Sequence, residues 1–356
     1  MEKATPYSSL KVFAHHDTLM GIENGERVAP IYVRFKPTNV CNHRCYYCSY
    51  ADEKLGLRNT VNRHDMIPRE KALEIVSDFA ELGVKGITLS GGGEPLTYPH
   101  IVELMKKILS MGIDLSLITN GSLLNEERAQ ILRQAKWVRI SCDAAQADTY
   151  AKIRNVPNTA LPTVFANIEE FAKIKNNDCE LGINYVVHHE NAAQVYEMVK
   201  RVKELGINHI KFSARVTKDL FAYHAPFRNK VVEDLHRAVE DFSDERFRVI
   251  NKYESDFDSA LVFHRDYDTC YINRMVTCVA ADSKVYFCHD KAYTSSGVVG
   301  DLQQKTFKDL WLDEAVIKRY KEFDCHKECN HHCVYDDRNI LLNTYFSLDK
   351  SQINFV

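Results

Sequence analysis

Between residue 31 and about residue 215, short apolar runs alternate with amphipathic stretches of 10–15 residues. The apolar runs predict six strands, at Ile31–Lys36, Gly86–Ser90, Asp114–Asn120, Trp137–Asp143, Glu180–Val187 and His209–Ala214. The stretches between them have the apolar spacing of helices, at Arg69–Leu82, Pro99–Ser110, Asn125–Gln134, Pro162–Lys175 and Ala192–Leu205. Strands that alternate with helices in this way predict a parallel sheet with helices on its outside.

Three glycines support this division of the chain. Gly83, Gly112 and Gly206 follow three of the predicted helices at the position of a C-cap. A parallel sheet of six strands that is closed or nearly closed is a partial α/β barrel, and its active site is expected at the C-terminal ends of the strands. We therefore predict an α/β fold with a partial (β/α)6 barrel over residues 31–215, preceded by an N-terminal extension at 1–30.

The regular alternation stops after residue 215. Residues 216–265 contain one clear helix and are otherwise polar, so we expect a bridging segment; the helix has an apolar stripe of Val231, Val232, Leu235, Ala238, Val239 and Phe242. Residues 266–335 hold six cysteines and a predicted hairpin around Ala281–Ser283, which indicates a second, small cysteine-rich α+β domain. Residues 336–356 form a C-terminal tail that the pattern does not assign to an element.

Composition excludes several classes of function. An apolar share of 45% and a charged share of 27% are typical of globular proteins. A net charge of -3 gives no basic field for nucleic acid or for a membrane surface, and no apolar run is long enough for a transmembrane helix. The first residues do not form a secretory signal. Eleven clustered cysteines favour metal binding in a reducing compartment, so we expect a cytoplasmic protein.

Three of these cysteines lie within eight residues, directly after the first predicted strand. The motif is Cys41-Asn-His-Arg-Cys45-Tyr-Tyr-Cys48, with spacings of three residues and then two. This spacing can direct three thiolates at one soft metal centre. An iron–sulfur cube held by three ligands leaves one iron open for a substrate or cofactor.

This motif resembles that of the radical S-adenosylmethionine (radical SAM) enzymes, and the resemblance covers roughly residues 30–215. It implies that Cys41, Cys45 and Cys48 bind a four-iron, four-sulfur cluster whose open iron is chelated by S-adenosylmethionine. It also implies reductive cleavage of that cofactor to a 5′-deoxyadenosyl radical, which abstracts a hydrogen atom from a substrate. The electron would come from a flavodoxin- or ferredoxin-type donor.

Further positions fit the resemblance. Tyr47 matches the family position that contacts the adenine, and the sequence from Ser90 to Pro95 resembles the family's Gly-Gly-Glu-Pro motif. Polar residues at other strand ends complete the predicted cofactor site. The predicted cofactor-binding residues are Tyr47, Gly92, Gly93, Glu94, Pro95, Asn120, Ser141, Asp143, Asn184, Ser213 and Arg215.

Strand alternation separates polar from apolar faces. Lys211, Ser213 and Arg215 share one face of the sixth strand, and a polar face on a central strand predicts a wet or liganded cavity because unpaired buried charge is costly. Cys142 and Cys179 fall out of phase with the predicted ligand faces, so we expect them to be core residues. Position and polarity make four residues candidates for substrate contact: Arg34, Arg154, Arg215 and His224.

The second cysteine set resembles the auxiliary-cluster extensions called SPASM and Twitch. Its members are Cys270, Cys278, Cys288, Cys325, Cys329 and Cys333. Since there are six cysteines and no Cys-x-x-Cys pair, we expect one auxiliary four-iron, four-sulfur cluster with four of the six as ligands. The leading candidates are Cys278, Cys288 and either Cys329 or Cys333, and the last three of the set would share one face of a helix. A structural zinc site is the alternative, with histidines at 289, 326, 331 and 332 nearby.

The resemblance leaves the reaction open. Only about 30 residues precede the first strand, too few for a separate peptide-recognition domain, which favours a small polar metabolite such as a sugar, nucleoside or sugar nucleotide. The leading hypothesis is a radical oxidoreductase or carbon-skeleton-modifying enzyme. The alternatives are a peptide-modifying enzyme, a radical epimerase that uses a cysteine thiol as hydrogen donor, and a non-enzymatic iron–sulfur electron carrier or regulator.

Overall fold

Ten strands form one sheet in the computed structural model of the chain, in the order β10-β9-β8-β1-β2-β3-β4-β5-β6-β7. The structure describes residues 8–50, 60–261, 265–329, 333–349, 351 and 353–354. The strands are β1 (Tyr32–Phe35), β2 (Gly86–Leu89), β3 (Asp114–Thr119), β4 (Trp137–Ser141), β5 (Glu180–Val187), β6 (His209–Ala214), β7 (Arg248–Asn251), β8 (Val276–Val279), β9 (Lys284–Tyr286) and β10 (Val298–Asp301). The α-helices are α1 (His16–Glu23), α2 (Arg69–Leu82), α3 (Ile101–Ser110), α4 (Glu126–Leu132), α5 (Ala147–Arg154), α6 (Ala160–Ile174), α7 (Val195–Lys203), α8 (Leu220–His224), α9 (Arg228–Phe242), α10 (Tyr253–Leu261), α11 (Phe307–Trp311), α12 (Glu314–Lys321), α13 (Cys325–Glu328) and α14 (Asp336–Phe346).

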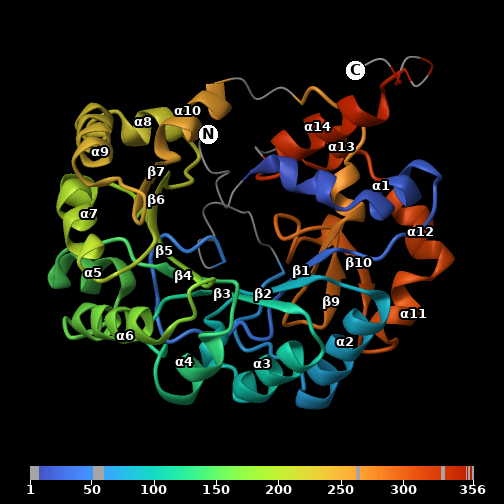
Figure 1. Cartoon of the computed structure of the whole chain (residues 1–356), viewed down its shortest axis with the longest axis horizontal. Helices are drawn as coiled ribbons and strands as arrows, with labels where there is room; N and C mark the ends of the chain where they lie inside the picture. Colours follow the sequence, from blue (N-terminus) through green and yellow to red (C-terminus); the bar gives the residue numbers. More distant parts are fainter. Residues whose placement is uncertain are drawn as a thin grey trace.

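The six predicted strands are confirmed as β1 to β6, which pair in parallel. Figure 1 shows the sheet curving, with α2, α3, α4, α6, α7 and α9 on its outer side. Alternate residues of each strand are buried under these helices, for example Val33 and Phe35 of β1. The core therefore lies between the convex face of the sheet and the helices, and the other residues of each strand face the concave side.

The sheet extends beyond the predicted barrel at both ends. β7 pairs in parallel with β6, and β8 pairs in parallel with β1. The expectation that residues 216–265 hold a single helix in a polar bridge is wrong, because this segment contains α8, α9, β7 and α10. Only Val249 of β7 is buried, so its sequence does not have the apolar signal of a central strand. The predicted hairpin around residues 281–283 is confirmed as β8 and β9.

Several helices outside the predicted set are present, among them α1, α5, α11, α12 and α14. The prediction that Cys325, Cys329 and Cys333 share one helical face is also wrong. α13 has only four residues, and Cys329 leaves it with extended dihedral angles of φ -122° and ψ 97°. The Asp324 carboxylate caps the helix by accepting from the backbone N–H groups of His326 and Lys327.

The C-terminal elements pack against the N-terminal part of the chain. The Arg27 guanidinium lies 3.8 Å from the ring centroid of Trp311 and 4.2 Å from that of Tyr320. The indole N–H of Trp311 donates to the carbonyl of Val28 at 2.9 Å. These contacts hold the segment just before β1 against residues of α11 and α12. No helix in the described part of the chain is long and apolar enough to cross a membrane.

Candidate active site

The cysteine motif forms a loop at the C-terminal end of β1, as expected for a parallel sheet with its site at that edge. Two neighbouring segments hold this loop through backbone hydrogen bonds. On one side, the N–H of Arg44 donates to the carbonyl of Arg154 at 2.9 Å, and that of Tyr46 donates to the carbonyl of Ile153 at 3.3 Å. On the other side, the N–H of Glu94 donates to the carbonyl of Val40 at 2.9 Å. The loop is therefore fastened both to α5 and to the glycine motif.

The three thiols of the loop are at least partly accessible and influence one another. Burial is the main cause that raises the pKa of the Cys41 thiol to about 12, and the charges of Cys45 and Cys48 add to the rise. The backbone N–H of His43 donates to the Cys41 sulfur at 3.4 Å, which favours the thiolate. In the described part of the chain, no three His, Cys, Asp or Glu side chains converge on a single metal ion. Three thiolates in one loop are a soft donor set that suits an iron–sulfur cluster, in which each thiolate binds a different iron.

The glycines of the second motif let its backbone approach the cysteine loop. A Cβ on Gly92 would lie 2.0 Å from Oδ1 of Asn39, and one on Gly93 would lie 2.1 Å from the carbonyl oxygen of Val40. Both distances are too short for any side chain. At the start of this motif, the buried Ser90 hydroxyl has no hydrogen-bond partner among the described residues, so it is available to a ligand.

Glu94 is buried at the junction of three strand ends. Its carboxylate accepts from the Thr119 hydroxyl at 2.6 Å, from the backbone N–H of Asn120 at 2.7 Å and from the backbone N–H of Leu96 at 3.1 Å. Burial raises the pKa of Glu94, and these hydrogen bonds oppose the rise. The Asn120 side chain in turn donates to Oδ1 of Asn42 at 2.8 Å. The predicted residues Glu94 and Asn120 are thus brought together against the cysteine loop.

Asp143 and Tyr47, both predicted cofactor residues, are in direct contact with each other. The Tyr47 hydroxyl donates to Oδ2 of Asp143, and the Arg154 guanidinium donates to Oδ1 through Nε at 3.0 Å and Nη2 at 2.8 Å. The carboxylate is fully buried and Arg154 is 4% exposed. This buried ion pair fixes the tyrosine ring next to Cys45 and Cys48, and it contradicts the expected role of Arg154 as a substrate contact.

The ends of β5 and β6 lie against the same loop. The Tyr46 hydroxyl donates to the Glu190 carboxylate and lies 3.1 Å from Nδ1 of His188. The Arg215 guanidinium lies 4.9 Å from the Tyr46 ring centroid. His224 is buried against the Tyr253 hydroxyl at 3.0 Å, so the structure also contradicts its expected role in substrate contact.

The remaining predicted residues lie on the strands as expected. Ser141, Asn184 and Ser213 are half-buried on the concave side of the sheet. Cys142 and Cys179 are buried in the main core, which confirms that expectation. The sequence did not single out Lys36, which is 1% exposed and donates from Nζ to the carbonyl of Gly91 at 3.0 Å. The signal in the sequence was that Lys36 follows Arg34 by two residues and therefore lies on the same face of the strand.

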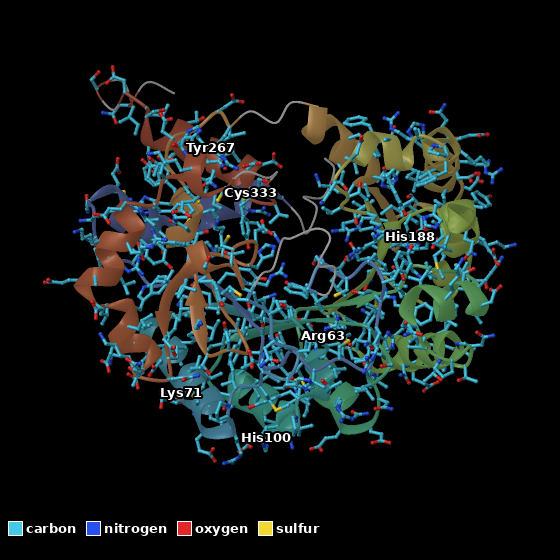
Figure 2. All side chains as sticks on the ribbon, turned by 180° about the vertical axis from the view of Figure 1, so that it is seen from behind. Arg63, Lys71, His100, His188, Tyr267 and Cys333 are labelled. Carbon is cyan, nitrogen blue, oxygen red and sulfur yellow. The ribbon has the colours of Figure 1, made fainter. Side chains whose placement is uncertain are left out.

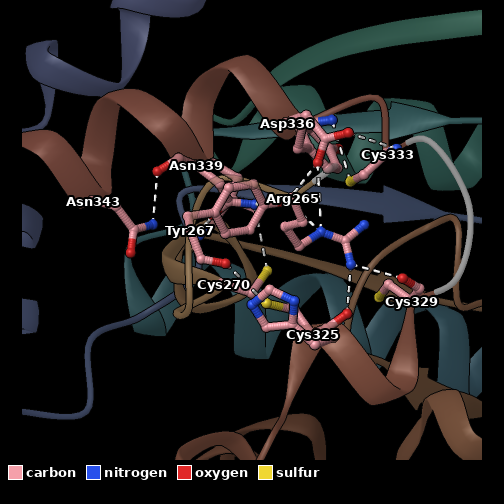
Figure 3. Close-up of polar contacts among 12 residues, drawn as sticks. Arg265, Tyr267, Cys270, Cys325, Cys329, Cys333, Asp336, Asn339 and Asn343 are labelled. Atoms are coloured by element: carbon pink, nitrogen blue, oxygen red, sulfur yellow. Dashed lines mark hydrogen bonds and ion pairs between the residues drawn. The ribbon is translucent and has the colours of Figure 1, made fainter. Parts of the chain in front are cut away.

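Four cysteines of the second set, Cys270, Cys325, Cys329 and Cys333, lie around Arg265 in Figure 3. The Arg265 guanidinium donates to the carbonyl of Cys325 and, at 2.7 Å, to that of Cys329. The Asn339 amide donates to the Cys270 sulfur at 3.6 Å. The backbone N–H of Tyr335 donates to the Cys333 sulfur at 3.3 Å. His188 contacts Tyr46 of the first cysteine loop, and Figure 2 shows His188 and Cys333 on opposite halves of the molecule.

Electrostatic interactions link five cysteines of the second set, Cys270, Cys288, Cys325, Cys329 and Cys333, and the charge of Cys325 acts on both Cys270 and Cys329. Burial raises the pKa of Cys270 to about 12 and that of Cys329 to about 11. Burial also raises the pKa of Cys288 and of Cys333, and the charges of Asp290 and of neighbouring cysteines add to the rise at both.

Cys325 and Cys278 make further contacts of their own. The Cys325 thiol donates to the carbonyl of Asp268 at 3.5 Å. Cys278 packs in a cluster with Ala280, Tyr286, Ala292 and Tyr293. No described residues converge on one zinc ion. His331 and His332 of the zinc alternative lie outside the described residues.

Comparison with known families decides which cofactor chemistry this arrangement serves. Residues 35–202 match the family model of the radical SAM superfamily. The chain carries a radical SAM domain. The enzymes of this superfamily use a four-iron, four-sulfur cluster and S-adenosylmethionine. The matched segment includes the cysteine loop, the glycine motif and strands β2 to β5.

Relatives with established names extend the similarity. A GTP 3′,8-cyclase from Microcystis aeruginosa is 31% identical over 215 residues, which are 58% of this chain and 64% of that protein. An AdoMet-dependent heme synthase from Methanosarcina barkeri is 30% identical over 50% of this chain and 48% of that protein. An S-adenosylmethionine-dependent nucleotide dehydratase from Flammeovirga pacifica is 25% identical over 70% and 74%. The match thus spans less than two thirds of the length of the first two relatives, 64% of one and 48% of the other.

Two solved structures share the fold over most of the chain. Streptococcus suis SuiB bound to S-adenosylmethionine superposes with a TM-score of 0.63 at 16% identity, covering 91% of this chain and 75% of SuiB. Native anSMEcpe with bound AdoMet gives a TM-score of 0.60 at 21% identity, covering 86% and 87%. At these identities the similarity concerns the fold of the radical SAM domain and of the elements that follow it.

Proposed function

We propose that the chain is a radical SAM enzyme that acts on a small polar metabolite. When bound, the cluster and S-adenosylmethionine supply a 5′-deoxyadenosyl radical that abstracts a hydrogen atom from the substrate. The single observation that supports this proposal most is that the cysteine loop is bonded to the backbone N–H of Glu94 and to the buried carboxylate of Asp143 at the C-terminal edge of the sheet.

Each group of residues then has a defined role. Cys41, Cys45 and Cys48 hold the cluster. The Ser90 hydroxyl is suited to donate to the carboxylate of the cofactor, and backbone carbonyls of the glycine motif are suited to accept from its ammonium group. Asp143 acts through Tyr47, because its carboxylate oxygens already accept from the tyrosine and from Arg154. Asp143 is therefore a positioning residue in this proposal.

The substrate class rests on the relatives. Two of them are named for nucleotide substrates, a GTP cyclase and a nucleotide dehydratase, and the dehydratase matches 70% of this chain. SuiB was solved with a precursor peptide, so a peptide-modifying reaction remains the alternative, beside a redox-neutral epimerase and an electron carrier.

The experiment that tests the proposal is anaerobic incubation of the reconstituted chain with S-adenosylmethionine, a strong reductant and fractionated small metabolites. We expect slow 5′-deoxyadenosine formation by the chain alone and a clear increase with one metabolite fraction. Mass loss of two hydrogens in the product would indicate oxidation, and deuterium uptake from the solvent would indicate epimerisation. An electron carrier would form no 5′-deoxyadenosine even with the first cluster fully loaded.

We further propose that Cys270, Cys288, Cys329 and Cys333 hold one auxiliary four-iron, four-sulfur cluster. Hydrogen bonds donated to the sulfurs of Cys270 and Cys333 suit thiolate ligands, since they stabilise the charged form. Cys325 has the opposite character, because its thiol is a donor to backbone carbonyls.

Iron analysis separates these cysteines. In anaerobically reconstituted chain we expect about eight iron atoms. Replacing Cys270 by alanine should remove about four of them. Replacing Cys325 by alanine, the matched control from the same cluster of residues, should leave the count unchanged. Equal loss in both variants would place Cys325 among the ligands, and zinc without iron beyond the first cluster would contradict the auxiliary cluster.

A further inference from the structure

Tyr293 connects the cysteine-rich C-terminal region with the segment that precedes the first cysteine motif. It is fully buried, and it lies shortly after Cys288, one of the cysteines proposed to hold the auxiliary cluster. Its hydroxyl donates to Oδ1 of Asn39, whose side chain is also buried. Two residues that are 254 positions apart in the chain therefore meet in a buried hydrogen bond between neutral groups.

Asn39 occupies the middle of the segment that holds the glycine motif. The carbonyl of Thr38 accepts from the N–H of Gly93 at 3.2 Å, and the carbonyl of Val40 accepts from the N–H of Glu94 at 2.9 Å. Val40 also directly precedes the cysteine motif. A displacement of Asn39 would therefore move both carbonyl groups that bind the glycine motif.

The side chains of Asn39 and Tyr293 also lie directly against the backbone of Gly92. A Cβ atom on Gly92 would be 2.0 Å from Oδ1 of Asn39 and 2.9 Å from Oη of Tyr293. Real side chains do not tolerate such distances, so the glycine allows the motif to approach this pair. The hydrogen-bonded pair thus supports the glycine motif from below as well as through its neighbours in the chain.

The Tyr293 hydroxyl is held in a defined orientation. It accepts from the backbone N–H of Ala281 at 3.3 Å while it donates to Asn39. Burial raises the pKa of Tyr293, so the hydroxyl keeps the proton that it donates. Its backbone has a φ of 61°, a left-handed conformation that is rare for a bulky residue and persists only where the surrounding structure enforces it. Residues with such strain gather at functional sites.

We propose that Tyr293 is a positioning residue for the S-adenosylmethionine site and holds the glycine motif, through Asn39, in the conformation that binds the cofactor. The inference rests on the proposed function, in which backbone carbonyls of the glycine motif accept from the ammonium group of the cofactor. Tyr293 acts on the affinity for the cofactor without touching it. The C-terminal region thereby takes part in cofactor binding.

Tyr293→Phe tests the proposal, because it removes the hydroxyl and keeps the buried ring. In the reconstituted chain we expect the dissociation constant for S-adenosylmethionine to rise by about three- to tenfold, since Oδ1 of Asn39 loses its donor inside the protein. Anaerobic equilibrium dialysis measures this constant. The iron content should match that of the unmodified chain, and the rate of 5′-deoxyadenosine formation should approach the unmodified rate only at saturating cofactor.

Tyr286→Phe is the matched control. Tyr286 is fully buried in the same cluster of side chains, and its ring centroid lies 5.8 Å from that of Tyr293. Its hydroxyl donates to the Asp282 carboxylate, away from the glycine motif. This variant removes the same atom from the same surroundings and should leave the dissociation constant for S-adenosylmethionine unchanged.

Hydrogen exchange gives a readout that does not depend on activity. In the reconstituted chain without cofactor, the backbone N–H groups of Gly93 and Glu94 should exchange faster in Tyr293→Phe than in the unmodified chain, because their acceptors lie on either side of Asn39. Tyr286→Phe should not change their exchange. Mass spectrometry of peptides that cover residues 91–96 measures the difference.

The outcomes separate this inference from the proposed function. An unchanged dissociation constant in Tyr293→Phe, or an equal rise in both variants, would overturn it. A lower maximum rate and a lower iron content at an unchanged dissociation constant would indicate a structural role alone and would overturn it as well. Dialysis and hydrogen exchange require no substrate and no turnover. The absence of metabolite-dependent 5′-deoxyadenosine formation would therefore contradict the proposed function and leave these measurements unaffected.

Discussion

Replacing Cys45 by alanine should remove the first cluster and reduce 5′-deoxyadenosine formation below detection. Cys45 lies between the other two ligands of the loop, and the loop backbone on both sides of it is held by hydrogen bonds to α5. The variant should therefore keep its fold and lose about four iron atoms per chain. Iron analysis, the visible absorption of the reconstituted protein and product analysis measure the three effects.

Cys142→Ala is the control for this substitution. Cys142 is fully buried in the main core beside the same strand end, but its side chain points to the convex face. Its loss should cost stability by about 1 kcal/mol through a small cavity and leave the iron count unchanged. Full iron content in Cys45→Ala, or loss of iron in Cys142→Ala, would contradict the assignment of the first cluster.

The sequence was informative wherever one physical signal governs a segment. Strands β1 to β6 have fully buried residues at alternate positions, and that burial is what an apolar pattern encodes. The short spacing of Cys41, Cys45 and Cys48 also keeps the three residues close together in space in any fold, because they lie in one loop. Fold class and cluster loop were therefore predictable.

Elements that depend on distant partners were not predictable in this way. β7 has one buried residue, and it exists because the edge of β6 offers it hydrogen bonds. The ligand set that we propose for the second cysteine group rests on hydrogen bonds from Asn339 and Tyr335, which lie outside the cysteine-rich segment or at its edge. Spacing alone favoured Cys278, which packs among apolar and tyrosine side chains.

The role of Asp143 shows the same limit for the active site. Strand alternation correctly placed it on the face of Ser141, which suggested a direct contact with the cofactor. The structure adds Arg154, which reaches Asp143 from the end of α5, a helix with a weak apolar stripe that the sequence pattern did not indicate. A carboxylate that is already paired acts on the site through its partners.

Replacing Arg154 by methionine should therefore have the largest effect on stability of any single change near the site. The substitution leaves Asp143 buried without its cation, which costs about 3–5 kcal/mol. It also removes the contact that holds Asp143, the partner of the Tyr47 hydroxyl, against the end of α5. That end of the helix binds the backbone of the cysteine loop. Urea unfolding of the cluster-free chain, followed by circular dichroism, measures the free energy without interference from iron.

A second variant distinguishes an electrostatic clamp from simple loss of packing. In Asp143→Asn with Arg154→Met, no uncompensated charge is buried, so the double variant should recover part of the lost free energy of unfolding. It should still incorporate less iron than the unmodified chain, because Tyr47 and the loop have lost their charged anchor. If the double variant is as unstable as Arg154→Met, the pair stabilises the loop through packing and its charges are incidental.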